Sequence, residues 1–194
     1  MNKMEKRELQ SSTIEIRESE NGNKVISGYA IKWEMKSHTL GYWRRFKEQF
    51  KNGAFTESLT NDNQFALWNH DVNTPLGSTE SNTLRLFEDN IGLRFEFDVG
   101  EGPWDQQAHE TIKRGIVKGV SFGFQMQKEE WDESDRDNIV RTVTKAKLIE
   151  ISPTPFPAYP DSQVSARSND PYKDYVEERE QVTLRKKLIL KTYL

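Results

Sequence analysis

Two residues of this chain have the types that acyl transfer by a nucleophile requires. Ser121 lies in the segment GVSFG, and His70 directly follows the apolar run 65–68. An alcohol attacks a carbonyl only when a base takes its proton, and imidazole accepts and returns a proton near neutral pH. His109 falls in a predicted helix and His38 in a polar loop, so His70 is the natural base. The pattern alone also fits an ordinary serine and a hydrogen-bonded histidine.

A predicted strand from Val120 to Met126 would present the serine for chemistry. Alternation along a strand puts the large residues of this run on one face and Ser121 and Gly123 on the other. The large face can anchor the strand in a core, and the glycine leaves open space beside the hydroxyl. GVSFG also fits the Gly-x-Ser-x-Gly elbow, but the parallel α/β sheet that the elbow requires is not predicted here.

Glu150 is a third candidate, because it is a carboxylate within the apolar strand end 147–153. Burial of a charge is costly unless the charge is paired. A bond to His70 would orient the imidazole, and a salt bridge to a lysine would explain the burial equally well. Asp71 suits the orienting role less, since neighbours on an extended chain point to opposite sides. Oxyanion donors could come from backbone amides near segment 115–119 or around Glu150.

Composition excludes several other classes of site. The chain has 194 residues, a net charge of −3 and no cysteine, which rules out thiol catalysis, disulfides and the usual structural zinc sites. The balanced charge gives no reason to expect nucleic acid as a partner. We expect no membrane span, no signal peptide and a soluble protein that works inside a cell or inside something assembled there. A metal-dependent hydrolase using His70, Asp71 and Glu48 is an alternative, but the spacing of ligands does not support it, and we expect neither metal nor cofactor.

The chain divides into three zones. Residues 1–12 are charged and expected to be flexible, residues 13–167 carry nearly all aromatic residues, and residues 168–194 form a charged tail of loosely helical spacing. We predict strands over 13–17, 25–31, 83–87, 93–99, 120–126 and 138–151, and helices over 53–59 and 103–115. The stretch 41–50 is expected to be a mobile loop, and a turn-rich segment follows His70. Many short strands with few helices predict a β-rich α+β fold, a closed or nearly closed β-barrel with flanking helices.

The order of several short motifs resembles the prohead maturation protease family of tailed phages, the caudovirus prohead serine proteases. The resemblance runs from about residue 27 to 167 and depends on order and spacing, because each motif alone is weak. The motifs are GYA at 28–30, EQF at 48–50 with GAF at 53–55, NHD at 69–71 with LG at 76–77, GL at 92–93, RG at 114–115, GVSFGF at 119–124, LIEIS at 148–152 and PAY at 157–159.

This resemblance implies a serine endopeptidase of phage or prophage origin, with residues 13–167 as the prohead protease domain. It implies a fold related to the herpesvirus assembly proteases, with Ser121 as nucleophile and His70 as general base. Glu150 stands where the phage pattern has an acidic residue and the herpesvirus proteins have a second histidine, so it is the expected orienter.

The resemblance also implies where the enzyme acts and on what. Scaffold segments, the major capsid protein and the protease itself would be cut during procapsid maturation, in the host cytoplasm inside the assembling procapsid. The herpesvirus relatives act as dimers, so the resemblance allows a homodimer, although the sequence identifies no interface. The alternative is a catalytically silent capsid-assembly or scaffold-binding module with the same barrel.

Overall fold

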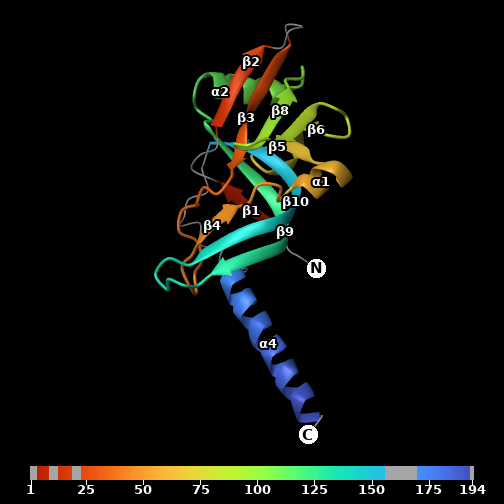
Figure 1. The fold of residues 1–194 in the computed structure, drawn as a ribbon. Coiled ribbons are helices and arrows are strands. Elements are labelled where there is room, and N and C mark those ends of the chain that lie inside the picture. Colours follow the sequence, from red (N-terminus) through yellow and green to blue (C-terminus); the bar gives the residue numbers. More distant parts are fainter. Residues whose placement is uncertain (1–3, 9–12, 19–22, 156–169, 193–194) are drawn as a thin grey trace.

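A computed structural model describes residues 4–8, 13–18, 23–155 and 170–192, whose strands form two sheets (Figure 1). The six-stranded sheet has the order β1-β9-β10-β5-β6, with β4 also paired to β10. Its strands are β1 (Met4–Glu8), β4 (Lys47–Phe50), β5 (Phe65–Trp68), β6 (Asp71–Ser78), β9 (Gly119–Asp132) and β10 (Val140–Thr154). The four-stranded sheet, β2-β3-β8-β7, contains β2 (Thr13–Glu18), β3 (Lys24–Lys32), β7 (Leu84–Glu88) and β8 (Gly92–Asp98). The described helices are α1 (Thr56–Asn61), α2 (Pro103–Lys113) and α4 (Pro171–Thr192).

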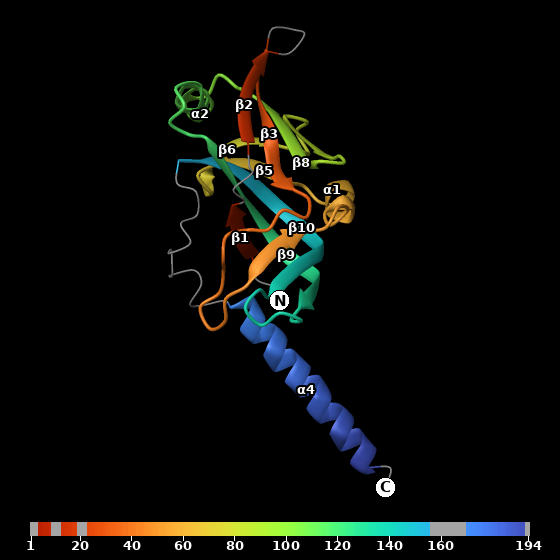
Figure 2. The ribbon, with the colours of Figure 1, turned by 60° about the vertical axis from the view of Figure 1, so that its left-hand side comes forward.

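The long antiparallel hairpin of β9 and β10 organises the larger sheet (Figure 2). The other edge of β10 is shared by two short parallel strands, β4 along Val140–Val143 and β5 along Glu150–Ile151. Pairing between β9 and β10 shifts register at three points between Val143 and Glu150. Such irregularities bend strands and increase twist, and the sheet curls accordingly.

The main core lies between the two sheets. Buried residues from β3 and β8, such as Ile31 and Phe95, belong to one cluster with Phe122 and Phe124 of β9. Phe50 lies among these aromatics, with ring centroids 5.4 Å from Phe122 and 5.2 Å from Phe124. Val120, Phe122 and Phe124 are fully buried, as the alternation of the 120–126 segment predicted.

The barrel, expected to be closed or nearly closed, is not closed. The strands separate into two sheets, and no backbone ladder joins the sheets in the described part of the chain. Aromatic and aliphatic side chains make the connection instead. A barrel and a pair of packed sheets both bury one face of each strand, so period-two alternation cannot distinguish them. The β-rich α+β class itself is confirmed.

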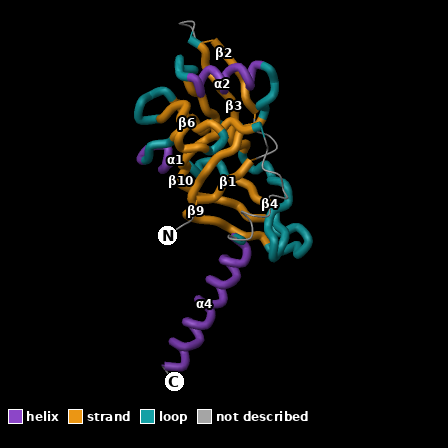
Figure 3. The backbone as a smooth tube through the Cα atoms, turned by 180° about the vertical axis from the view of Figure 1, so that it is seen from behind, coloured by secondary structure: helices purple, strands orange, loops and turns teal. Residues whose placement is uncertain are grey.

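Most predicted elements are present, and four strands, β1, β4, β5 and β6, were not predicted (Figure 3). The six predicted strands correspond to β2, β3 and β7 to β10, and the two predicted helices to α2 and the shorter α1. Segment 41–50 was expected to be a loop but ends in β4, and the segment after His70 is β6. Met4–Glu8 was expected to be frayed and instead forms β1, because its backbone pairs with the edge of β9.

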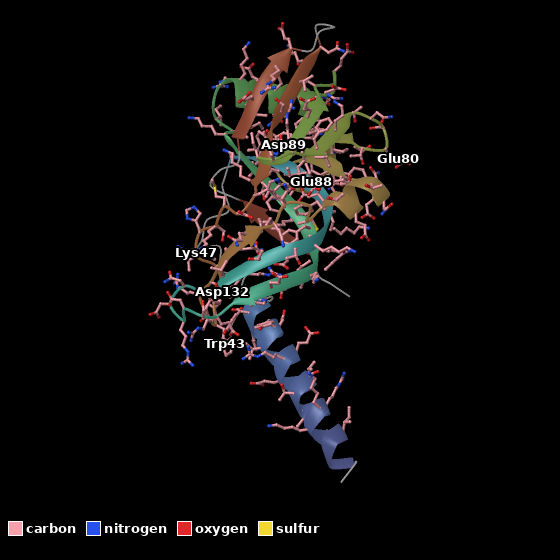
Figure 4. All side chains as sticks on the ribbon, in the orientation of Figure 1. Trp43, Lys47, Glu80, Glu88, Asp89 and Asp132 are labelled. Carbon is pink, nitrogen blue, oxygen red and sulfur yellow. The ribbon has the colours of Figure 1, made fainter. Side chains whose placement is uncertain are left out.

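Helix α4 lies within the charged tail and extends away from the sheets in Figures 1 and 2. Its first turn is attached by Tyr172, whose hydroxyl donates to Glu133 at 2.6 Å and whose ring lies 5.1 Å from that of Trp131. Figure 4 shows Trp43 and Asp132 at the end of the body from which the helix leaves. Neither α4 nor any other described helix is long and apolar enough to cross a membrane.

Candidate active site

His70 lies in a tight turn and is held there by backbone contacts. Asn69 and His70 join β5 to β6, and both have positive φ angles, 51° and 62°. Two-residue hairpin loops need such angles, and the second position usually carries glycine. The backbone N–H of Asn69 donates to the carbonyl of Pro153 at 3.2 Å, and the Asn69 amide oxygen accepts from Thr154 at 3.0 Å. A histidine in this conformation is held against β10, which suggests a role for its side chain.

Glu150 holds the imidazole of His70, and Ser152 holds Glu150 and the His70 backbone. The ring Nδ1 lies 2.7 Å from Glu150 Oε1, and the Ser152 hydroxyl donates to Glu150 Oε2 at 2.5 Å. The same hydroxyl oxygen accepts the backbone N–H of His70 at 3.2 Å. Glu150 is 1% exposed, so its carboxylate depends on these partners. Because Nδ1 is bonded to the carboxylate, the second ring nitrogen, Nε2, remains for other chemistry.

Ser121 lies on the same face of the sheet as this network. In the β9–β10 ladder, Ser121 pairs with Ser152 and Gly123 pairs with Glu150. Directly paired residues of an antiparallel ladder project to the same side. Folding therefore brings the three predicted residues to one surface, although they are far apart in the chain.

The Ser121 hydroxyl has a different partner from the one the sequence predicted. It donates to the backbone carbonyl of Arg7 in β1 at 3.0 Å, and within the described residues no hydrogen bond joins it to His70. Ser121 is only 3% exposed, so the oxygen that was expected to be accessible is buried beside β1. The space beside Gly123 is also filled, because a Cβ there would lie 2.1 Å from Met4 Cε and 2.5 Å from Glu150 Oε1.

A buried cluster of charges links β1 to β4, β9 and β10. Its five members are Glu5, Arg7, Glu48, Glu129 and Arg141. The Arg141 guanidinium, 1% exposed, contacts all three carboxylates at 2.5 to 2.8 Å. Burial raises the pKa of Glu5, but Arg7 and Arg141 outweigh it, and the pKa is lowered.

Sequence reasoning missed this cluster and Ser152. Glu48 was noted only in the EQF motif and in the metal-site alternative, and Arg141 alternates with Ile139 and Val143, which are buried apolar residues. That second feature was a usable signal, since a buried arginine requires acidic partners. The sequence E-I-S at 150–152 likewise puts Ser152 on the same face as Glu150.

The remaining predicted candidates lie elsewhere. Glu48 pairs with Arg7 and Arg141, while Asp71 is exposed and accepts from Asn73, so neither shares its bonds with His70. No group of three or more histidine, aspartate or glutamate side chains in the described ranges is placed to hold a metal ion. His109 is buried on α2, and this burial lowers its pKa. The PAY motif at 157–159 lies outside the described residues.

Comparisons with known proteins identify the family and a similar fold. The model of the caudovirus prohead serine protease family matches residues 12–175. No curated protein matches the sequence. Among solved structures, the capsid assembly protease gp21 of bacteriophage T4 has a similar fold, with a TM-score of 0.50 over 77% of this chain and 97% of its own. The two sequences are 13% identical, so that likeness concerns the fold alone.

Proposed function

The chain belongs to the caudovirus prohead serine protease family, and from this premise we propose that it cuts scaffold and capsid-protein segments during procapsid maturation. Scaffold segments and the major capsid protein are the proposed substrates, and the protease itself is a third. The proposed location is the assembling procapsid in the host cytoplasm. The relationship in fold to the herpesvirus assembly proteases stays a prediction. The homodimer stays a prediction as well.

In the proposed mechanism, Ser121 is the nucleophile and His70 the general base. The hydroxyl attacks the carbonyl carbon of the scissile bond while imidazole Nε2 takes its proton and then returns it to the leaving amine. Water, activated by the same nitrogen, hydrolyses the acyl-enzyme and restores the serine. Glu150 holds Nδ1 in one tautomer and stabilises the positive charge that the ring acquires.

The observation that carries this assignment is the bond of 2.7 Å between His70 Nδ1 and Glu150 Oε1, beside Ser121 on one face of the sheet. An imidazole oriented by a buried carboxylate next to a serine is the arrangement on which triad proteases depend, whatever their fold. The hydrogen bond from Ser121 to Arg7 belongs to a resting state in this proposal. Displacement of β1 frees the hydroxyl to turn toward Nε2.

The test is cleavage of cognate scaffold and major capsid protein by the full chain, followed by mass analysis of the products. We expect Ser121→Ala to reduce cleavage to background while the melting temperature stays within a few degrees. Ser134→Ala is the matched control, because Ser134 lies in the turn after β9 and, among the described residues, forms hydrogen bonds only to Asp132. Persistent cleavage by the Ser121 variant would overturn the assignment.

A further inference from the structure

Strand β1 covers the serine as an extended peptide would. It pairs antiparallel with β9, with Arg7 opposite Phe122 and Glu8 opposite Ser121. It is the outermost strand, so the larger sheet is complete without it and would then present the free edge of β9. An exposed strand edge binds extended peptides through backbone hydrogen bonds. The carbonyl facing the serine hydroxyl is that of Arg7, at 3.0 Å.

Arg7 and Glu5 project from β1 into the charged cluster. The Arg7 Nε donates to Glu48 Oε1 at 2.7 Å, and its guanidinium lies 5.8 Å from the centre of the Phe124 ring. Glu5, two residues earlier on the same face, accepts two hydrogen bonds from Arg141, at 2.8 and 3.0 Å. Both side chains therefore meet a partner of opposite charge on other strands of the same sheet.

The cluster would be incomplete without a strand of this charge pattern. With β1 removed, Arg141 alone would face the two carboxylates of Glu48 and Glu129. Glu48 is fully buried, so losing Arg7 would leave its carboxylate with one cation in a poorly solvated position. Arg141 would at the same time lose the paired bonds to Glu5. A replacement strand restores both only if it brings an anion and, two residues later, a cation.

We propose that β1 occupies the groove in which the substrate strand binds, and that Glu48 and Arg141 select its sequence. This inference depends on the proposed function, in which Ser121 attacks a backbone carbonyl. The residue whose carbonyl contacts Ser121 is therefore the residue after which the chain is cut. Glu48 selects a basic side chain at that residue, and Arg141 selects an acidic side chain two residues before it. The substrate class is extended protein segments with the pattern acidic-x-basic ahead of the cut.

Two peptides of identical composition test the charge order. One carries residues 2–12 of this chain, NKMEKRELQSS, and the other has the residues at positions 5 and 7 exchanged, so length and net charge are the same. We expect the full chain to cleave the first after its arginine with a kcat/KM at least tenfold above that of the exchanged peptide. Equal rates within threefold, or cleavage at another bond, would overturn the inference.

A binding measurement separates this inference from the proposed function. Fluorescence anisotropy with the full-length Ser121→Ala, Arg7→Ala double variant needs no catalysis and weakens the hold of β1. We expect the first peptide to bind at least tenfold more tightly than the exchanged one. Discrimination in binding with no cleavage by the unaltered chain would defeat the protease proposal alone. Cleavage without discrimination, or binding of neither peptide, would defeat the charge-pattern inference alone.

A substitution of Glu48 tests whether this side chain determines the preference for a basic residue at the cleaved position. Glu48→Gln, in an otherwise unaltered chain, should reduce the preference for arginine over glutamine at the cleaved residue at least fivefold. The preference for the acidic residue should persist, since Arg141 remains. Glu130→Gln is the control, because Glu130 is exposed on the same strand as Glu129. An unchanged arginine preference in the Glu48 variant would refute the role of this carboxylate.

Discussion

Replacement of Glu150 by glutamine tests how the proposed site works. The substitution keeps the size of the side chain and removes its charge. In the structure the carboxylate lies 2.7 Å from His70 Nδ1 and accepts from Ser152 at 2.5 Å. Glutamine can still bond to both groups, but its amide can hold the ring in the wrong tautomer. It cannot stabilise the cation that forms when the base takes the proton.

The size of the effect follows from the geometry. With the charge centres about 4 Å apart and an effective dielectric constant of about 20, the imidazolium and carboxylate attract by about 4 kcal/mol. Because about 1.4 kcal/mol corresponds to a factor of ten in rate, the loss of this interaction corresponds to about a 10³-fold decrease in kcat. KM should change little, since the lost attraction acts only when the ring becomes charged in the transition state.

The assay is steady-state cleavage of one fluorogenic peptide by the full-length protein, with thermal unfolding measured alongside. Glu130→Gln, an exposed substitution of the same chemistry, should retain the kcat of the unaltered chain. A Glu150→Gln variant that stays folded and loses less than tenfold in kcat would refute the orienting role. A loss confined to KM would refute it too.

Three further predictions concern the surroundings of the site. Gly123→Ala should lower kcat at least tenfold in a folded protein, because the added methyl would lie 2.5 Å from Glu150 Oε1 and push it from the imidazole; unchanged kcat in steady-state assays would contradict this. Phe50→Ala should lower the free energy of unfolding by about 3 to 5 kcal/mol in urea titration, since Phe50 is fully buried among aromatic rings; a loss under 1 kcal/mol would show that the cluster repacks. Glu5 has its pKa lowered from 4.5, despite burial, by Arg7 and Arg141, so its contribution to stability is present above pH 4.5 and is lost as the pH falls through the folded-state pKa. Amide protection factors of residues 4–8 should therefore fall below pH 4.5 before those of β10, and a simultaneous loss in both would argue against this order.

The local patterns of the chain predicted much of the scaffold. Alternation of apolar and polar residues identified β8 and the buried face of β9, and the Pro103 start with the closing Gly115 identified α2. Short strands without clear alternation were missed, because β4 and β6 depend on pairing with other strands. The same limitation affected β1, whose charged residues were taken for a solvated end although they meet charges on distant strands.

For the candidate site, residue types and local positions were enough to select His70, Ser121 and Glu150 as groups that could act together. Their proximity was beyond local patterns, because it depends on the register of β9 against β10 and on a turn that holds His70 against Ser152. The covering of Ser121 by Arg7 and the burial of Arg141 among three carboxylates likewise arise from long-range pairing. Alternation specifies which side of a strand faces inward, whereas only the folded chain specifies which residues meet there.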